Sequence, residues 1–119
     1  MLISMLKAKL HHLRVTQAEL DYEGSLTLDP VIMKKVGLLV NEKILVANLE
    51  NGERFETYII EGKRGSRVAC LNGAAAHKGK VGDRLIVMAW CLLTPAQAKK
   101  HRPKAVRFNA RNEIVATVR

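Results

Sequence analysis

Gly24 and Ser25 are residues that could do chemistry, and they follow Tyr22 and Glu23 in a short polar stretch. A serine hydroxyl becomes a nucleophile when neighbouring groups activate and orient it. A preceding glycine has no Cβ, so the chain can turn sharply there and leave the carbonyl open to attack. Taken alone, however, Gly-Ser is among the commonest turn dipeptides, and a plain turn is its usual meaning. The pair becomes a candidate site only through the rest of the sequence.

His11 and His12 are candidate metal ligands, because imidazole binds metals readily. Adjacent residues on a strand point to opposite faces, and neither a carboxylate nor a third histidine stands at a matching interval. Cys70 and Cys91 lie in apolar runs, where a small hydrophobic residue would serve equally well, without a second ligand at metal-binding spacing. We therefore expect no metal site and two free, buried thiols.

The net charge of +9 raises the question of a nucleic-acid partner. Much of that charge lies near the C-terminus, where Glu113 is the one acid among seven basic residues: Lys99, Lys100, Arg102, Lys104, Arg107, Arg111 and Arg119. Such a run is more often a solvated tail than a binding surface. A small basic β-barrel that binds nucleic acid is the alternative, but an aromatic content of 4% provides few platforms for stacking bases. We expect no nucleic-acid partner, and a positive field that favours a small anionic substrate.

The longest apolar stretch, 85–93, is nine residues long, whereas a membrane-spanning helix needs about 20. It is expected to be a buried strand. The apolar start of the chain is short and has no basic residues ahead of it, unlike a secretory signal. We expect a cytoplasmic protein with no membrane partner.

The elements that must position the chemistry are mostly strands. Hydrophobic residues make up 48% of a chain poor in aromatic residues, so the core must consist of Val, Ile, Leu and Ala. Turn signals recur about every eight to twelve residues, which is the spacing of a compact sheet or barrel. At 119 residues, the chain should form one domain over 1–119.

Individual elements follow from local signals. Asp29-Pro30 and Gly37 bound a helix at 31–36, and Asn51-Gly52 favours a type I′ hairpin. Asn72-Gly73 could open a short helix or loop whose amides face an anion. The expected strands are 8–16, 44–49, 54–60, 85–93 and 113–118, and a second helix begins at Thr94-Pro95. In 8–16, strict alternation puts Lys9, His11 and Leu13 on one face, and Leu10, His12 and Arg14 on the other.

Four stretches together resemble the aspartate 1-decarboxylase family over nearly the whole chain. They are Met5-Leu-Lys-Ala-Lys-Leu-His11, Tyr22-Glu-Gly-Ser25, Asn51-Gly-Glu-Arg-Phe-Glu-Thr-Tyr58, and Arg64-Gly-Ser-Arg67 continuing to Asn72-Gly-Ala-Ala-Ala-His77. The resemblance implies a six-stranded double-psi β-barrel with short helices, assembled as a homotetramer whose active sites are shared between neighbouring subunits. Leu26, Ala47 and the tail past Pro103 depart from the family pattern.

The resemblance also implies how the catalyst arises. The chain would cut itself between Gly24 and Ser25 into fragments 1–24 and 25–119, and Ser25 would become a pyruvoyl group. That group, without metal or pyridoxal phosphate, would decarboxylate L-aspartate to β-alanine and carbon dioxide for pantothenate and coenzyme A synthesis. Whether an accessory protein promotes the cut stays open. A relative that keeps the fold without processing is the alternative, and the presence of Gly24-Ser25 with Thr57 and Tyr58 disfavours it.

The resemblance assigns roles to further residues. Tyr58 would donate a proton to the carbanion, and Thr57 would contact both substrate and the oxyanion formed during processing. Arg54, which without the resemblance would be interpreted as an ordinary solvated arginine, would hold the aspartate carboxylate that is retained in β-alanine. Strict alternation puts Arg54 and Tyr58 on one strand face and Thr57 on the other, so a bulge or strand end is expected. The remaining implied site residues are the pocket lysine Lys9, the binding loop Gly73, Ala74 and Ala75, and the supporting residues His11 and Asn72.

Overall fold

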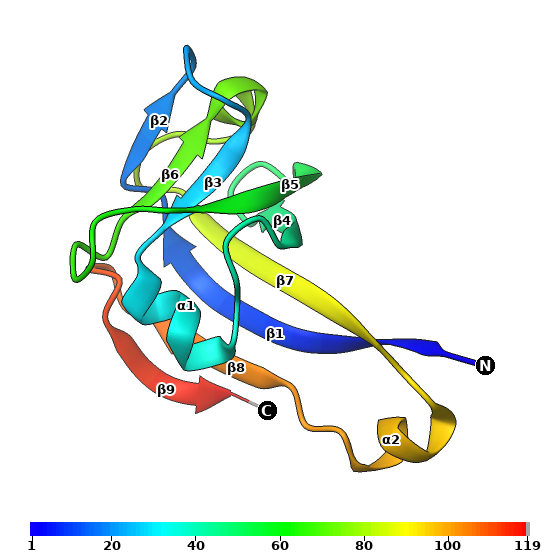
Figure 1. Cartoon of the computed structure of the whole chain (residues 1–119). Helices are drawn as coiled ribbons and strands as arrows, with labels where there is room; N and C mark the ends of the chain where they lie inside the picture. Colours follow the sequence, from blue (N-terminus) through cyan, green and yellow to red (C-terminus); the bar gives the residue numbers. More distant parts are fainter. Residues whose placement is uncertain (119) are drawn as a thin grey trace.

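The structure is a computed structural model that describes residues 1–118, and it is built mainly of strands (Figure 1). Arg119, the last residue of the expected basic tail, lies outside the described residues. The strands are β1 (Ile3–Arg14), β2 (Gln17–Glu19), β3 (Ser25–Leu28), β4 (Lys43–Asn48), β5 (Arg54–Glu61), β6 (Ala69–Asn72), β7 (Arg84–Leu93), β8 (Lys104–Phe108) and β9 (Ile114–Val118). The helical segments are α1 (Pro30–Val36), the 3₁₀ helix η1 (Gly73–Lys78) and α2 (Pro95–Lys100).

The strands pair in the order β2-β6-β3-β5-β4-β7-β1-β8-β9. β1 with β8, β2 with β6, and β3 with β5 are parallel, and the other neighbours are antiparallel. β1 and β7 form a long twisted pair that runs through the molecule to its N-terminal end (Figure 1). The expected mainly β fold with short helices is confirmed, with nine strands in the sheet.

The local predictions are confirmed for α1, α2, the strand 85–93, the strand at the C-terminal end and the pairing of β4 with β5. Asp29 caps α1 by accepting a hydrogen bond from the Val31 amide, and Gly37 ends the helix with φ +72°. The prediction of a type I′ turn is wrong, because Gly52 has a positive φ but Asn51 does not. Such a turn needs both, and the connection is instead a longer turn closed by a hydrogen bond from the Gly52 amide to the Asn48 carbonyl.

The expected solvated tail is wrong over 104–108, where β8 joins the sheet ahead of the expected last strand, β9. β8 lies parallel to β1, and its residues Ala105, Val106 and Phe108 are buried. Their apolar character marks a strand, which the flanking basic residues obscure in the sequence.

A bulge breaks the strict alternation expected for β1. The register with β7 shifts between His11 and Leu13, and His12 has φ +66°. Leu10 and Leu13 are therefore both buried in the same core, contrary to the expected alternation. The rings of His11 and His12 stack with centroids 4.0 Å apart, so the expectation that they point apart is also wrong.

The core consists of aliphatic side chains from both parts of the sheet and from α1, as the composition predicts. Each fully buried aliphatic side chain contributes about 1.5–3 kcal/mol relative to an exposed one. The members with no exposed surface are Leu10, Leu13, Leu26, Leu28, Val46, Ile59, Ala69, Leu71, Leu85 and Ala89. Within residues 1–118, no helix combines the length and apolar character needed to cross a membrane.

Candidate active site

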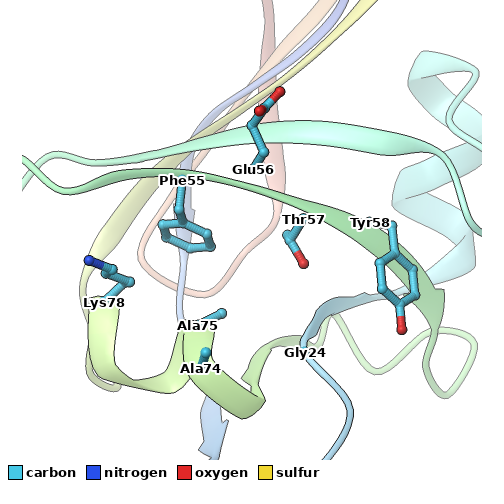
Figure 2. A pocket seen from close by; sticks show the side chains of 8 residues that line it. All are labelled: Gly24, Phe55, Glu56, Thr57, Tyr58, Ala74, Ala75 and Lys78. Carbon is cyan, nitrogen blue, oxygen red and sulfur yellow. The ribbon is translucent and has the colours of Figure 1, made fainter.

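A pocket of about 370 Å³ lies between β5, η1 and the segment just ahead of β3. Figure 2 shows β5 on one side and η1 on the other, with Gly24 close to Tyr58 and with Lys78 at the opposite end. The lining residues are Gly24, Phe55, Glu56, Thr57, Tyr58, Ala74, Ala75 and Lys78. Of the site residues predicted from the sequence, Gly24, Thr57, Tyr58, Ala74 and Ala75 therefore share one cavity.

The strand pairing explains how Gly24 reaches this pocket. β3 runs parallel to β5 and antiparallel to β6, with Leu26 opposite Ile59 and Ser25 opposite Asn72. The residue before β3 therefore lies beside the start of η1 and near Tyr58. Residues more than thirty positions apart in the sequence meet through this one three-strand unit.

Ser25 is fully buried, and its hydroxyl is held on both sides. Ser25 Oγ donates to the Glu23 carbonyl at 2.9 Å and accepts from Asn72 Nδ2 at 3.0 Å. Asn72 is itself buried and also donates to Thr27 Oγ1 at 2.8 Å. The hydroxyl beside Gly24 is thus fixed within the chain instead of rotating freely in solvent.

Gly73 has no room for a side chain, whereas Gly24 does. A Cβ on Gly24 would meet no atom within 4 Å among the described residues, and Gly24 is not among the glycines with positive φ. Gly24 lies in a bend, as the expected turn requires, but without a positive φ. Gly73 has φ +63°, and a Cβ there would lie 2.7 Å from the Tyr22 carbonyl oxygen and 2.8 Å from Gly24 Cα. Gly73 lets the loop press against the segment 22–24.

Thr57 and Tyr58 both line the pocket although they are adjacent on β5. The pairing of β5 with β4 ends at Tyr58, and its pairing with β3 begins at Ile59. Tyr58 therefore lies where the strand passes from one neighbour to the next. The expected bulge or strand end is not found, because β5 continues to Glu61 without a register shift. Figure 2 shows the Thr57 hydroxyl and the Tyr58 phenol both directed toward the side on which Gly24 lies.

Arg54, Lys9 and His11 do not line this pocket; they lie on the outer face of the sheet. Arg54 is opposite Ala47, Ala47 is opposite Ile86, and Ile86 is opposite His11, so these four form one row across β5, β4, β7 and β1. Paired residues in such a row project from the same side of a sheet.

The next row places Lys9 on the same outer face. It runs through Glu56, Leu45, Met88 and Lys9 across the same four strands. Between the two rows, Val46 and Val87 face the core. The sequence-predicted site is thus divided in one chain between the pocket and the outer face.

His11 lies in a positive environment. Its burial, followed by the nearby His12, Lys9 and Arg107, lowers the pKa of His11 below its ordinary value. His11 Nδ1 is buried and has no hydrogen-bond partner within residues 1–118. Among these same residues, no three His, Cys, Asp or Glu side chains are grouped so as to hold a metal ion.

Sequence reasoning missed three residues that border the pocket, Phe55, Glu56 and Lys78. The carboxylate of Glu56 is directed away from η1, toward the outer face (Figure 2). Phe55 could have been found, because alternation from Thr57 puts it on the same strand face. Lys78 carried no such signal, since it reaches the pocket through the turn of η1. Its Nζ pairs with Glu53 Oε2 at 3.0 Å.

The cysteines also differ from expectation. Both are free, but Cys91 is only half-buried on β7. Cys70 is buried as expected, yet it is more than a small hydrophobic residue, because its Sγ lies 3.2 Å from Asn72 Oδ1.

Two asparagine side chains hold η1 in place at the end opposite Gly24. Asn48 Nδ2 donates to the Lys78 carbonyl at 3.0 Å and to Asp83 Oδ2 at 2.9 Å. Asn51 Nδ2 donates to the same Lys78 carbonyl at 2.9 Å. The β4–β5 turn thereby fixes the end of the helical segment that carries Ala74 and Ala75.

Known proteins resemble this chain over nearly its full length. The family model described as aspartate decarboxylase matches residues 1–115. The aspartate 1-decarboxylase of Caldicellulosiruptor saccharolyticus is 54% identical over 115 residues, which cover 97% of this chain and 90% of the relative. Those of Clostridium acetobutylicum and Bacillus licheniformis are 50% and 49% identical, covering 94% and 93% of this chain and 88% and 87% of theirs.

Among solved structures, a rationally designed protein matches 66% of this chain and 91% of its own length, with a TM-score of 0.48 and 15% identity. That likeness is too slight to support a conclusion. The match to the family model and the identities of about half over nearly the full length are sufficient by themselves. This chain therefore belongs to the aspartate decarboxylase family of carboxy-lyases.

Proposed function

We propose that this chain cuts itself between Gly24 and Ser25 and then, with a pyruvoyl group derived from Ser25, converts L-aspartate to β-alanine and carbon dioxide for pantothenate synthesis. The observation that carries the proposal is the buried Ser25 hydroxyl, which is held between the Glu23 carbonyl and Asn72 Nδ2 next to the pocket residue Gly24. A serine in an ordinary turn would be solvated and would bond only to the backbone close to it.

The cut begins when Ser25 Oγ attacks the Gly24 carbonyl carbon. The hydroxyl proton passes to the amide nitrogen as the C–N bond breaks, which turns the peptide into an ester. Loss of the Ser25 Cα proton then expels the Gly24 carboxylate and leaves a dehydroalanine. Its tautomer is hydrolysed by one water, which releases ammonia and leaves a ketone at the new end of the chain. Thr57 is the proposed donor to the oxyanion at Gly24.

The residues around Ser25 fit a small acyl group at this position. Ser25 lies beside the close contact of Gly73 with Tyr22 and Gly24, and the pocket side of Gly24 is open. A pyruvoyl group supplies an electrophile that takes up the electrons released with carbon dioxide. The side chains of this chain bind and orient the substrate and return a proton. Tyr58 is the proposed proton donor, and its phenol is directed toward Gly24 (Figure 2).

The basic residues of the site come, in this proposal, from a second copy of the chain. Arg54, Lys9 and His11 share the outer face of the sheet and do not reach the pocket of their own subunit. That outer face also carries the exposed Trp90 and Leu92. A homotetramer of double-psi barrels would bring the outer face of one subunit against the pocket of its neighbour. Arg54 would then hold the carboxylate that stays, because pairing the departing one would oppose its loss.

The test is the intact mass of freshly purified protein and of its Ser25→Ala variant. The parent should yield fragments 1–24 and 25–119, the larger one carrying a pyruvoyl end. Ser25→Ala should stay a single folded chain without activity, because only the attacking hydroxyl is lost. Borohydride added with aspartate should attach substrate to the larger fragment. Cleavage in the alanine variant, or labelling of a lysine peptide, would contradict the proposal.

A further inference from the structure

A hydrogen-bond chain connects the Cys70 thiol to the residue at the cleavage point. Cys70 and Asn72 lie two residues apart on β6, and both are buried. Cys70 Sγ is 3.2 Å from Asn72 Oδ1, while Asn72 Nδ2 donates to Ser25 Oγ at 3.0 Å and to Thr27 Oγ1 at 2.8 Å. The oxygen and both N–H groups of the Asn72 amide therefore each have a hydrogen-bond partner.

The chain has one consistent direction. The single hydroxyl proton of Ser25 is donated to the Glu23 carbonyl at 2.9 Å, so Ser25 Oγ must accept from Asn72. Asn72 must then present its NH₂ group to Ser25 and its oxygen to Cys70. The buried Asn72 oxygen needs a hydrogen-bond donor as its partner, and the protonated thiol of Cys70 is such a donor. Burial and the charge of Glu19 raise the pKa of the Cys70 thiol against the opposing hydrogen bond with the Glu19 backbone, which keeps the proton on sulfur.

We infer that Cys70 is a positioning residue for self-cleavage: its thiol holds the Asn72 amide in the orientation that donates to the nucleophile Ser25 Oγ. The inference rests on the proposed function and adds a residue to it. If the amide turned over, Asn72 Oδ1 would face Ser25 Oγ and compete for its proton. The hydroxyl would then lose the donor that stabilises negative charge on Oγ as its proton leaves.

A packing role alone predicts something different. If Cys70 served only to fill space in the core, its hydrogen-bonding ability would be irrelevant, and a donor-free residue of similar size would serve well. If it orients Asn72, serine should replace it, while alanine and valine should not. The order of the variants therefore separates the two roles.

The experiment follows cleavage of each full-length chain over time by intact mass, directly after rapid purification, together with thermal unfolding of the uncut form. The variants are Cys70→Ser, which keeps a donor, and Cys70→Ala and Cys70→Val, which lack one. Cys70→Val keeps bulk at the site if Cys70→Ala does not fold. Cys91→Ala is the matched control, since Cys91 is the other free thiol and lies on β7.

We expect Cys70→Ser and Cys91→Ala to cleave within about twofold of the parent. Cys70→Ala and Cys70→Val should cleave about five- to tenfold more slowly, the worth of one neutral hydrogen bond. Parental rates in the folded donor-free variants, or equal slowing of serine and alanine, would overturn the role of Cys70 alone. Absence of fragments 1–24 and 25–119 from the parent and from Cys91→Ala would instead overturn the proposed function.

Discussion

At the scale of single residues, Thr57 and Tyr58 are neighbours that we assign to different reactions. Tyr58→Phe keeps the ring, so Ser25 should still be processed, but turnover should fall by roughly 10²–10⁴-fold, the usual worth of a positioned general acid. Thr57→Val should slow self-cleavage itself by about 10²–10³-fold, because a donor to the oxyanion is lost. Fragment ratio and β-alanine production would be measured in the same samples. A Tyr58→Phe chain that stays uncut would remove Tyr58 from the role of proton donor.

Single residues also mark how far the sequence could be used. Alternation within β5 could have supplied Phe55, and the family resemblance supplied Gly24, Thr57 and Tyr58, which the pocket brings together. The hydrogen bond from Cys70 to Asn72 could not be predicted, because an apolar run indicates burial but does not say which polar atom will lie 3.2 Å away. The bulge at His12 was equally hidden, since its cause lies in the pairing with β7.

At the scale of elements, the start of η1 is positioned by a glycine that cannot be replaced cheaply. Gly73→Ala places a Cβ against Tyr22 and Gly24, so it should both destabilise the fold and slow the cut. Gly52→Ala is the control, because Gly52 also has positive φ but a Cβ there meets nothing within 4 Å among the described residues. Both variants should lose about 1–2 kcal/mol from backbone strain, measured by denaturant unfolding of the uncut chains. Slowing of the cut to the same degree in both would refute a specific role for this contact.

Elements with strong local signals were predictable from the sequence. The capping residues and Gly37 give α1, the nine-residue apolar run gives β7, and Asn51-Gly52 correctly predicts which two strands pair. β8 was missed because Lys104 and Arg107 interrupt its apolar residues, and its stability comes from pairing with the distant β1. A local pattern carries no information about such a partner.

At the scale of the whole molecule, the division of the site between two faces can be tested by mixing subunits. Chains carrying Arg54→Gln and chains carrying Tyr58→Phe should each be nearly inactive alone. Co-expressed in equal amounts, they should recover about a quarter of the parental activity, since random assembly joins an intact pocket to an intact Arg54 at one site in four. β-Alanine production by the co-purified oligomer would be the measurement. No recovery in an oligomer shown by native mass to contain both chains would mean that Arg54 does not serve a neighbouring pocket.

The placement of β1 has a consequence for the life of the protein after the proposed cut. β1 lies wholly within the proposed fragment 1–24, yet it forms ten residue pairs with β7, pairs with β8, and contributes the fully buried Leu10 and Leu13. Before the cut, these contacts form within one chain. Afterwards, a denatured molecule must find its missing strand by collision, so refolding becomes second order and depends on concentration. Only the uncut precursor would therefore refold efficiently, and the lifetime of the cut protein would be set by its unfolding rate.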